Sequence, residues 1–217
     1  GYARILCLGL LPLLLGLRVI DPPPVEELRV RTFDTYQIIR PRETTQRPVV
    51  IIDIDEKSLA KLGQWPWPRT RVADLVQRLT ELGAAAIAFD IVFAEADRLS
   101  PNIAADGFRD LDDATRHKLR ALPSNDQVMA DVLRKSPVVL GESGLPTVMP
   151  QADIKLPLTG LATLGGDPQP FLLNFPGLLR NIPILEEAAP GRGLFTIRTE
   201  RDGIVRRVPM IMLAQGN

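Results

Sequence analysis

The first 20 residues are dominated by apolar side chains. Residues 5–17 read ILCLGLLPLLLGL without a charge, between Arg4 and Arg18. Because a membrane-spanning helix needs about 20 apolar residues, we expect residues 1–20 to be a membrane-anchor helix that is truncated at its N-terminal end. A cleaved signal peptide is an alternative, but no small-residue cleavage site follows the apolar run. A buried core helix is a third reading, which Pro12 disfavours.

Residues 21–48 mix charged and apolar positions, and we expect them to connect this helix to a globular domain over residues 49–217. The domain opens with the run VVIIDI at residues 49–54, which is continuous and rich in β-branched side chains. Such a run is typical of a strand buried on both faces of a parallel sheet. The first core strand is therefore predicted here.

A helix and a second strand follow this run. Apolar residues recur at helical spacing up to the helix-stopping Gly83, namely Val72, Leu75, Val76, Leu79 and Leu82. Residues 84–93 (AAAIAFDIVF) form another continuous apolar run, which predicts a second buried strand. Residues 49–93 are therefore expected to form one β-α-β unit with a right-handed crossover.

The alternation continues once more after a polar stretch, residues 99–122, which is expected to lie on the surface. Ser124 or Asn125 caps the next predicted helix, since both side chains can accept a hydrogen bond from the first turn. Pro137 ends that helix before a third strand at residues 138–141.

The pattern changes toward the C-terminus. Residues 194–199 and 204–213 flank a turn at Asp202-Gly203, and we expect them to add antiparallel strands to the sheet. The predicted fold class is α/β. It consists of a β-α-β-α-β parallel core, extended by antiparallel strands at its C-terminal end and preceded by a membrane-anchor helix.

Composition excludes some classes of function. The 217 residues include 26 Lys plus Arg and 26 Asp plus Glu, so the chain lacks the basic excess of a nucleic-acid-binding protein. Cys7 is the single cysteine, which excludes a disulfide within the chain and a cysteine metal site. The single histidine, His117, lies in the polar stretch and is given little weight as a metal ligand or catalytic base.

Acidic residues follow the first two predicted strands. They are Asp53, Asp55, Asp90, Glu95 and Asp97. Ligands of open parallel sheets bind outside the carboxyl ends of the strands, so these residues mark the best candidate site. Their oxygens could hold Mg²⁺ or Ca²⁺, but carboxylates at strand ends also cap helices and accept hydrogen bonds from turn amides. We favour the structural role over metal binding.

A tryptophan and proline block precedes the first domain helix. Trp65 and Trp67 alternate with prolines, so their rings are expected either to stack on a ligand or to cover the end of the sheet, with cover favoured. Arg69 is expected to pair with one of the strand-end acids and to hold the block in place.

Three short motifs occur along this part of the chain. They are Ile-Asp-x-x-Ser at Ile54, Asp55 and Ser58, Trp-Pro-Trp-Pro-Arg at residues 65–69, and Phe-Asp-x-x-Phe at residues 89–93, followed by Glu95 and Asp97. Together with DGIVRRVP at residues 202–209, they resemble the CHASE domain of the second type, an extracellular sensor domain associated with cyclases and histidine kinases. The resemblance implies one membrane helix before the domain, three after it, and a cytoplasmic output module that is commonly a nucleotide cyclase or a kinase.

The resemblance and the apolar leader together predict the extracytoplasmic sensor domain of a bacterial transmembrane signalling receptor, held at the cell membrane. We expect a homodimer that responds to a small molecule or an envelope signal, without catalytic residues, a cofactor or a nucleic-acid partner. The candidate ligand-binding residues are Asp53, Asp55, Ser58, Trp65, Trp67, Arg69, Asp90, Glu95 and Asp97.

Two alternatives stay open. One is a metal-dependent phosphohydrolase, because Asp53-x-Asp55 after an apolar strand superficially resembles the nucleophile motif of haloacid-dehalogenase-like enzymes. The other groups of such a site are missing from the sequence. The second alternative is a purely structural dimerisation module, which is compatible with sensing.

Overall fold

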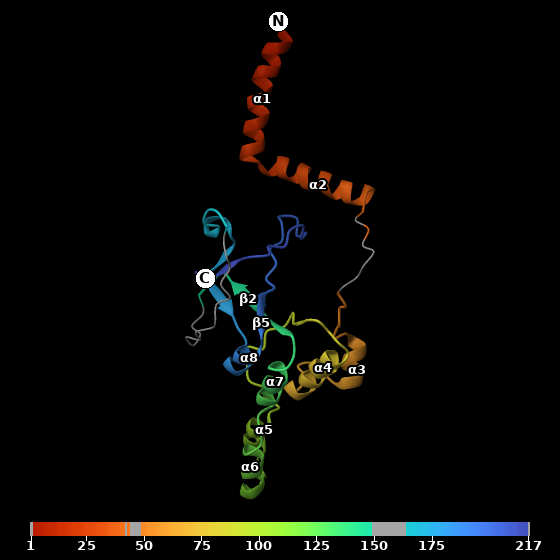
Figure 1. Cartoon of the computed structure of the whole chain (residues 1–217), viewed down its shortest axis with the longest axis vertical. Coiled ribbons are helices and arrows are strands. Elements are labelled where there is room, and N and C mark those ends of the chain that lie inside the picture. Colours follow the sequence, from red (N-terminus) through yellow and green to blue (C-terminus); the bar gives the residue numbers. More distant parts are fainter. Residues whose placement is uncertain (1, 42, 44–48, 149–163, 217) are drawn as a thin grey trace. The chain divides into compact units, whose positions relative to one another are not determined.

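The structure is a computed structural model that describes residues 2–41, 43, 49–148 and 164–216. The chain divides into two units, Gly1–Asp55 and Glu56–Asn217. Figure 1 shows two long helices in the first unit, and shorter helices around a small sheet in the second.

The first unit contains helices α1 (Tyr2–Ile20) and α2 (Pro23–Ile39). The chain bends by 85° between them. Asp21 has a positive φ of 43° at the bend, and its carboxylate accepts a hydrogen bond of 2.6 Å from the Arg29 guanidinium. Proline can begin a helix but lacks the N–H that continues one. The Pro-rich sequence after Asp21 therefore ends α1 and begins α2 as a separate helix.

The predicted membrane helix corresponds to α1. In the described part of the chain, no single helix is both long enough and apolar enough to cross a bilayer. Leu8–Ile20 and Pro23–Ile39 reach the required length and composition only when they are taken together across the bend.

Residues 49–54 do not form the predicted first strand. Their backbone carries no regular secondary structure, and the apolar side chains are exposed, with Val50 at 83% and Ile51 at 87%. No strand of the described residues pairs with this segment. The prediction of a buried strand is therefore wrong for this structure. A β-branched run favours extended backbone, but its burial depends on a partner strand that the run itself does not specify.

The second unit begins with helices α3 (Glu56–Leu62) and α4 (Arg69–Glu81). After the strand β1 (Ile87–Ala88), α5 (Pro101–Gly107) and α6 (Asp113–Arg120) pack against each other in the polar stretch. Helices α7 (Asn125–Leu133) and α8 (Pro183–Ala188) complete the α-helices, and a short 3-10 turn, η1, spans Gln169–Phe171.

The predicted cap of α7 is confirmed. The Ser124 hydroxyl accepts a hydrogen bond of 3.1 Å from the Gln127 amide, so Ser124 and not Asn125 is the cap of α7. In the polar stretch, Asp112 caps α6, because its carboxylate accepts a hydrogen bond of 2.9 Å from the Thr115 amide.

The main sheet is built around one strand, β2 (Val138–Leu145). Strand β1 (Ile87–Ala88) pairs parallel to it with Ile87 opposite Val138, and β5 (Gly191–Leu194) pairs parallel to it with Gly191 opposite Val139. Strand β4 (Gly177–Leu179) pairs antiparallel to the second half of β2. The sheet is therefore mixed. Its parallel strands are β1, β2 and β5, and not the predicted series that begins with residues 49–54.

A second, two-stranded sheet pairs β3 (Asn174–Phe175) with β6 (Leu213–Ala214) in parallel. The turn expected at Asp202-Gly203 forms, since Gly203 has a φ of 80° and its amide donates to the Glu200 carbonyl at 2.9 Å. The long antiparallel strands predicted on either side of it do not form, and β6 is the part of the second one that is a strand.

One continuous apolar core joins the sheet to helices α4, α7 and α8. In Figure 1, α7 lies beside both α4 and α8, in agreement with the contacts between these helices. The fully buried side chains of the core are Val76, Met129, Ala130, Leu133, Val138, Leu140 and Leu185. Of the apolar positions that predicted α4, Val72 and Val76 therefore face this core, whereas Leu82 is exposed.

The first testable consequence concerns Gly141 in β2. A Cβ atom there would lie 2.5 Å from the Phe89 carbonyl oxygen and 2.7 Å from the Phe195 ring, so Gly141→Ala should destabilise the domain by about 1–3 kcal/mol. Gly193→Ala is the matched control, because its Cβ would meet Val139 at an ordinary 3.6 Å. Urea unfolding of both variants measures the difference, and equal stabilities would contradict the packing described here.

Candidate functional site

The Trp-Pro block places its two indole rings in different environments. The rings of Trp65 and Trp67 meet edge to face, with centroids 5.8 Å apart. Trp67 is 6% exposed, and its Nε1 donates to the Gly63 carbonyl at 2.8 Å, whereas Trp65 is 36% exposed. Trp67 therefore covers the domain interior, as favoured from the sequence, and Trp65 is the ring that a ligand can reach.

Asp97 holds together the beginnings of two helices. Its Oδ2 accepts from the Arg69 backbone amide at 2.7 Å, at the start of α4, and from Asn125 Nδ2 at 2.8 Å, at the start of α7. Its Oδ1 accepts from the Leu99 amide at 2.9 Å. A carboxylate at a helix N-terminus satisfies amides that lack an intrahelical partner. Asp97 is therefore a structural cap in the loop that follows β1.

The Arg69 side chain lies in the same network. Its Nη2 donates to the Glu95 carbonyl at 3.2 Å, its Nε lies 3.6 Å from Asp126 Oδ1, and its guanidinium stands 4.4 Å from the centre of the Phe93 ring. The expected ion pair of Arg69 is thus formed, but with Asp126 of α7. Asp126 Oδ2 also accepts from the Asp97 amide at 3.0 Å.

Burial works against both charges of this pair. Desolvation lowers the pKa of Arg69, and the nearby carboxylates of Asp126 and Asp97 oppose that shift. Desolvation also raises the pKa of Asp126, while the Asp97 amide and then Arg69 act in the opposite direction. The attraction between the two charges thus offsets part of the cost of burying each of them. The pair therefore fixes α7 to the start of α4.

A cleft of about 580 Å³, which we call the Trp-Pro cleft, opens beside this network. It is lined by Gln64, Trp65, Pro66, Arg69, Glu95, Ala96, Asp97, Arg98 and Leu99. Its volume is within the range of small-molecule sites. Its lining offers one exposed indole ring together with both acidic and basic residues.

The cleft brings together four of the nine candidate residues, namely Trp65, Arg69, Glu95 and Asp97. The other five do not line it. Trp67 is buried, Asp90 is exposed elsewhere in the second unit, and Ser58 lies on α3, while Asp53 and Asp55 belong to the first unit. The expected gathering of strand-end acids is therefore incomplete, since residues 49–54 do not form a core strand.

No group of three or more metal-ligating side chains occurs in the part of the chain that the structure describes. The phosphohydrolase alternative needs Asp53 at the end of a buried strand, and that strand does not form.

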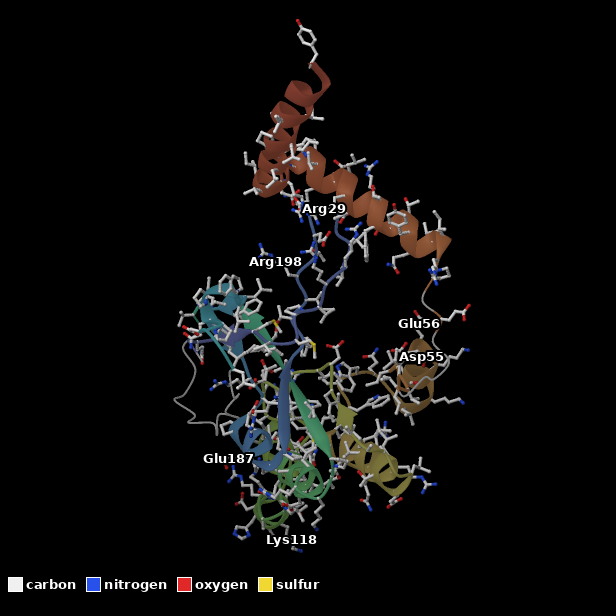
Figure 2. All side chains as sticks on the ribbon, turned by 45° about the horizontal axis from the view of Figure 1, so that its top comes forward. Arg29, Asp55, Glu56, Lys118, Glu187 and Arg198 are labelled. Carbon is white, nitrogen blue, oxygen red and sulfur yellow. The ribbon has the colours of Figure 1, made fainter. Side chains whose placement is uncertain are left out.

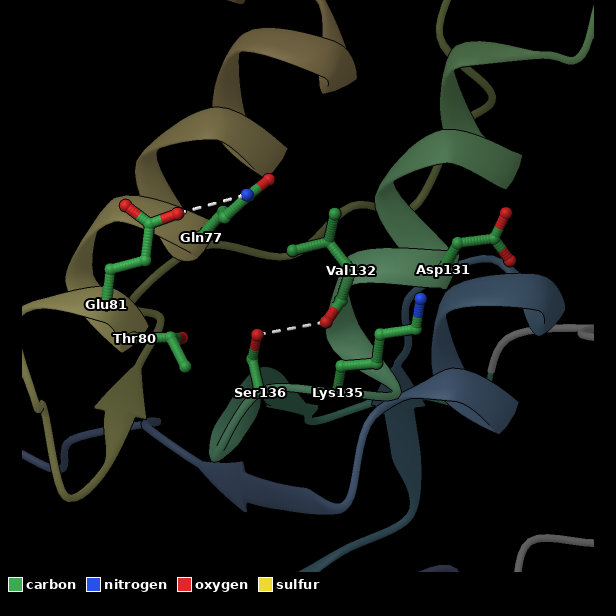
Figure 3. Close-up of a pocket in the computed structure, with 7 residues that line it drawn as sticks. All are labelled: Gln77, Thr80, Glu81, Asp131, Val132, Lys135 and Ser136. Atoms are coloured by element: carbon green, nitrogen blue, oxygen red, sulfur yellow. Dashed lines mark hydrogen bonds between the residues drawn. The ribbon is translucent and has the colours of Figure 1, made fainter.

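A smaller hollow of about 300 Å³ lies between α4 and α7 (Figure 3). Its lining is Gln77, Thr80, Glu81, Asp131, Val132, Lys135 and Ser136. The hydrogen bonds drawn there stay within one helical turn, from Gln77 to Glu81 and from Ser136 to the Val132 carbonyl. Because these polar groups are engaged by their own helices, the Trp-Pro cleft is the stronger candidate for a binding site.

Comparison with known families agrees with the motifs of the cleft. The model of the CHASE2 domain matches residues 7–216, which is essentially the whole chain. The chain belongs to the CHASE2 family. This is a family of sensor domains without catalytic activity of their own. No curated protein and no solved structure matches the chain at a significant level.

In this CHASE2 domain, the sequence motifs have mainly architectural roles. Arg69, which ends the Trp-Pro block, and Asp97, which follows the Phe-Asp-x-x-Phe motif, meet at the start of α4. Asp126 was not expected at this site from the sequence, although an acidic residue in the first turn of a capped helix was an available signal.

The pair between Arg69 and Asp126 predicts a strong dependence of stability on both partners. Arg69→Met should destabilise the CHASE2 domain by about 3–5 kcal/mol, because it leaves the Asp126 carboxylate buried without its counter-charge. Adding Asp126→Asn to this variant should recover part of the loss. Urea unfolding of the two single variants and the double variant tests this, and losses that simply add would show that the two side chains do not interact.

Proposed function

We propose that the chain is the extracytoplasmic sensor portion of a membrane-anchored bacterial signalling receptor, and that it regulates a cytoplasmic nucleotide cyclase or kinase. The family match over residues 7–216 carries this proposal, because it joins the apolar helix and the sensor domain in one pattern. The proposed identity of the output module rests on the association of such domains with cyclases and histidine kinases.

The surface of α1 supports an anchoring role. Its exposed large apolar side chains include Leu8, Leu10, Leu11, Leu13, Leu14, Leu15, Leu17, Val19 and Ile20. These positions cover every side of the helix, and a helix that is apolar all round fits a lipid environment or a protein core. Among the described residues of the first unit these side chains are exposed, which fits contact with lipid.

The Trp-Pro cleft is the proposed ligand site of the sensor. Trp65 offers a stacking surface, and Glu95 and Arg98 bring opposite charges to the same opening. The cleft borders the loop after β1, which is tied to both α4 and α7 through Asp97. A ligand that binds one arrangement of this loop more tightly than another shifts the population of the whole helical layer. A homodimer would then transmit the shift through its membrane helices.

Membrane topology tests the proposal. The whole chain, with α1 extended at its N-terminus to a full membrane span, is fused after Asn217 to alkaline phosphatase or to green fluorescent protein. We expect an active, membrane-bound phosphatase, because this enzyme folds only outside the cytoplasm. We expect the green fluorescent protein fusion to be dark, because that reporter becomes fluorescent in the cytoplasm.

A matched control replaces Leu11 and Leu14 of α1 with arginine, which is costly in a bilayer and should abolish membrane retention. An inactive phosphatase together with a bright fluorescent fusion would place the domain in the cytoplasm and overturn the proposal.

A further inference from the structure

Strand β2 carries a carboxylate at a position where an apolar side chain is expected. Side chains alternate between the two faces of a strand. Val138 and Leu140 are fully buried in the core, and Glu142 follows on the same face with 8% exposure. Burying a charge at such a position is costly unless it is well paired. Glu142 is therefore unusual among the core positions of the sheet.

Its neighbour Glu186, on α8, is completely buried but fully paired. Glu186 Oε1 accepts from the Asn181 amide at 2.9 Å and from Asn181 Nδ2 at 2.8 Å. Glu186 Oε2 forms an ion pair of 2.6 Å with Arg192 Nε of β5. The nearest guanidinium on β5 is thus already bound to the other carboxylate of the cluster.

Glu142 lacks comparable partners. Its Oε1 is buried and accepts no hydrogen bond, and the Nε of Arg180, in the segment after β4, lies 3.8 Å away. This distance permits attraction without a hydrogen bond. The paired strand β1 contributes only Ile87 and Ala88, and β4 contributes only apolar residues, so neither supplies a charge. The charged groups that act on Glu142 are therefore Glu186, Arg180 and Arg192.

The electrostatic consequence is a carboxyl group that titrates in the neutral range. Burial raises the pKa of Glu142 to about 7, and the Glu186 carboxylate contributes to the same shift. Arg180 and Arg192 act in the opposite direction but do not cancel it. A glutamate with its ordinary pKa would be fully ionised throughout this range.

The cluster is linked to the rest of the domain by direct contacts. Asn181, which binds Glu186, also accepts from the Phe93 amide at 2.7 Å and donates to the Gly141 carbonyl at 3.1 Å. Phe93 in turn lies under the Arg69 guanidinium, which lines the Trp-Pro cleft. A change of charge beside Glu186 is therefore connected through packed groups to the proposed ligand site.

We propose that Glu142 is a proton-binding site, formed with Glu186, Arg180 and Arg192, and that the proton is a ligand of this sensor domain. Uptake of one proton converts the Glu142 carboxylate to the neutral acid and removes its repulsion from Glu186. The link from proton binding to an output rests on the proposed function, whereas proton binding itself does not.

The sign of the effect on stability follows from linkage. The pKa of Glu142 is about 7 in the folded chain, against an ordinary value of 4.5 that applies when the chain unfolds. The folded state therefore binds a proton that the unfolded state does not hold between these two values. As the pH falls through about 7, the contribution of Glu142 to stability rises, and it levels off below 4.5.

The test uses the whole chain in detergent micelles, with ¹³C-labelled glutamate carboxyl groups followed by NMR from about pH 4 to about pH 9. We expect one glutamate signal with a midpoint near 7, absent in Glu142→Gln and retained in Glu187→Gln. Glu187 is the matched control because it lies on the exposed side of α8 (Figure 2).

The same variants give a second readout in unfolding experiments. Relative to Glu142→Gln, the folding equilibrium constant of the wild-type chain should rise roughly 70-fold between about pH 8 and about pH 5. A wild-type chain whose glutamates all titrate in their ordinary range would overturn the proposal, even if Glu142→Gln fails to fold. A neutral-range signal that persists in Glu142→Gln would overturn it as well. Neither result depends on the topology of the fusions, so the two proposals fail independently.

Discussion

Hydrogen bonding along both edges of β2 is the constraint on which the second unit depends. The strand pairs with β1 and β5 in parallel and with β4 in antiparallel orientation, so the sheet holds together through it. Its buried face sets the packing of α7 and α8, and its other face is crowded enough at Gly141 that a side chain would meet backbone. The carboxylate of Glu142 is placed by the same strand. The helices, the neighbouring strands and the buried carboxylate of the second unit are therefore all positioned by β2.

Two polar networks join the elements around this framework. One, around Asp97, fixes the starts of α4 and α7, and its residues Arg69 and Asp97 line the Trp-Pro cleft. The other, around Glu186, joins α8 and β5 to the segment after β4. The Phe93 region connects them, because its amide is bound by Asn181 and its ring by Arg69. A ligand in the cleft and a proton on Glu142 would thus act on one connected set of contacts.

Local patterns in the sequence were sufficient for the helices and for part of the sheet. The apolar spacing of α4 and the serine cap of α7 are local features, and both are confirmed. The failure at residues 49–54 has a clear cause, since a β-branched run specifies an extended backbone without naming its partner. The roles of Asp126 and Glu186 were not predicted, because the sequence does not show whether a single acidic residue is buried. Glu142 did have a signal, the alternation from Val138 through Leu140, which places a carboxylate on the core face.

The central claim is that the domain senses its surroundings and that protons are among its ligands. Output of the whole receptor in sealed membrane vesicles tests this claim most directly, with the pH on the side of the domain stepped from about 8 to about 6 while the other side is held constant. The account predicts an output that changes with this step in the wild-type receptor and stays flat in Glu142→Gln. The same response in both receptors would contradict it.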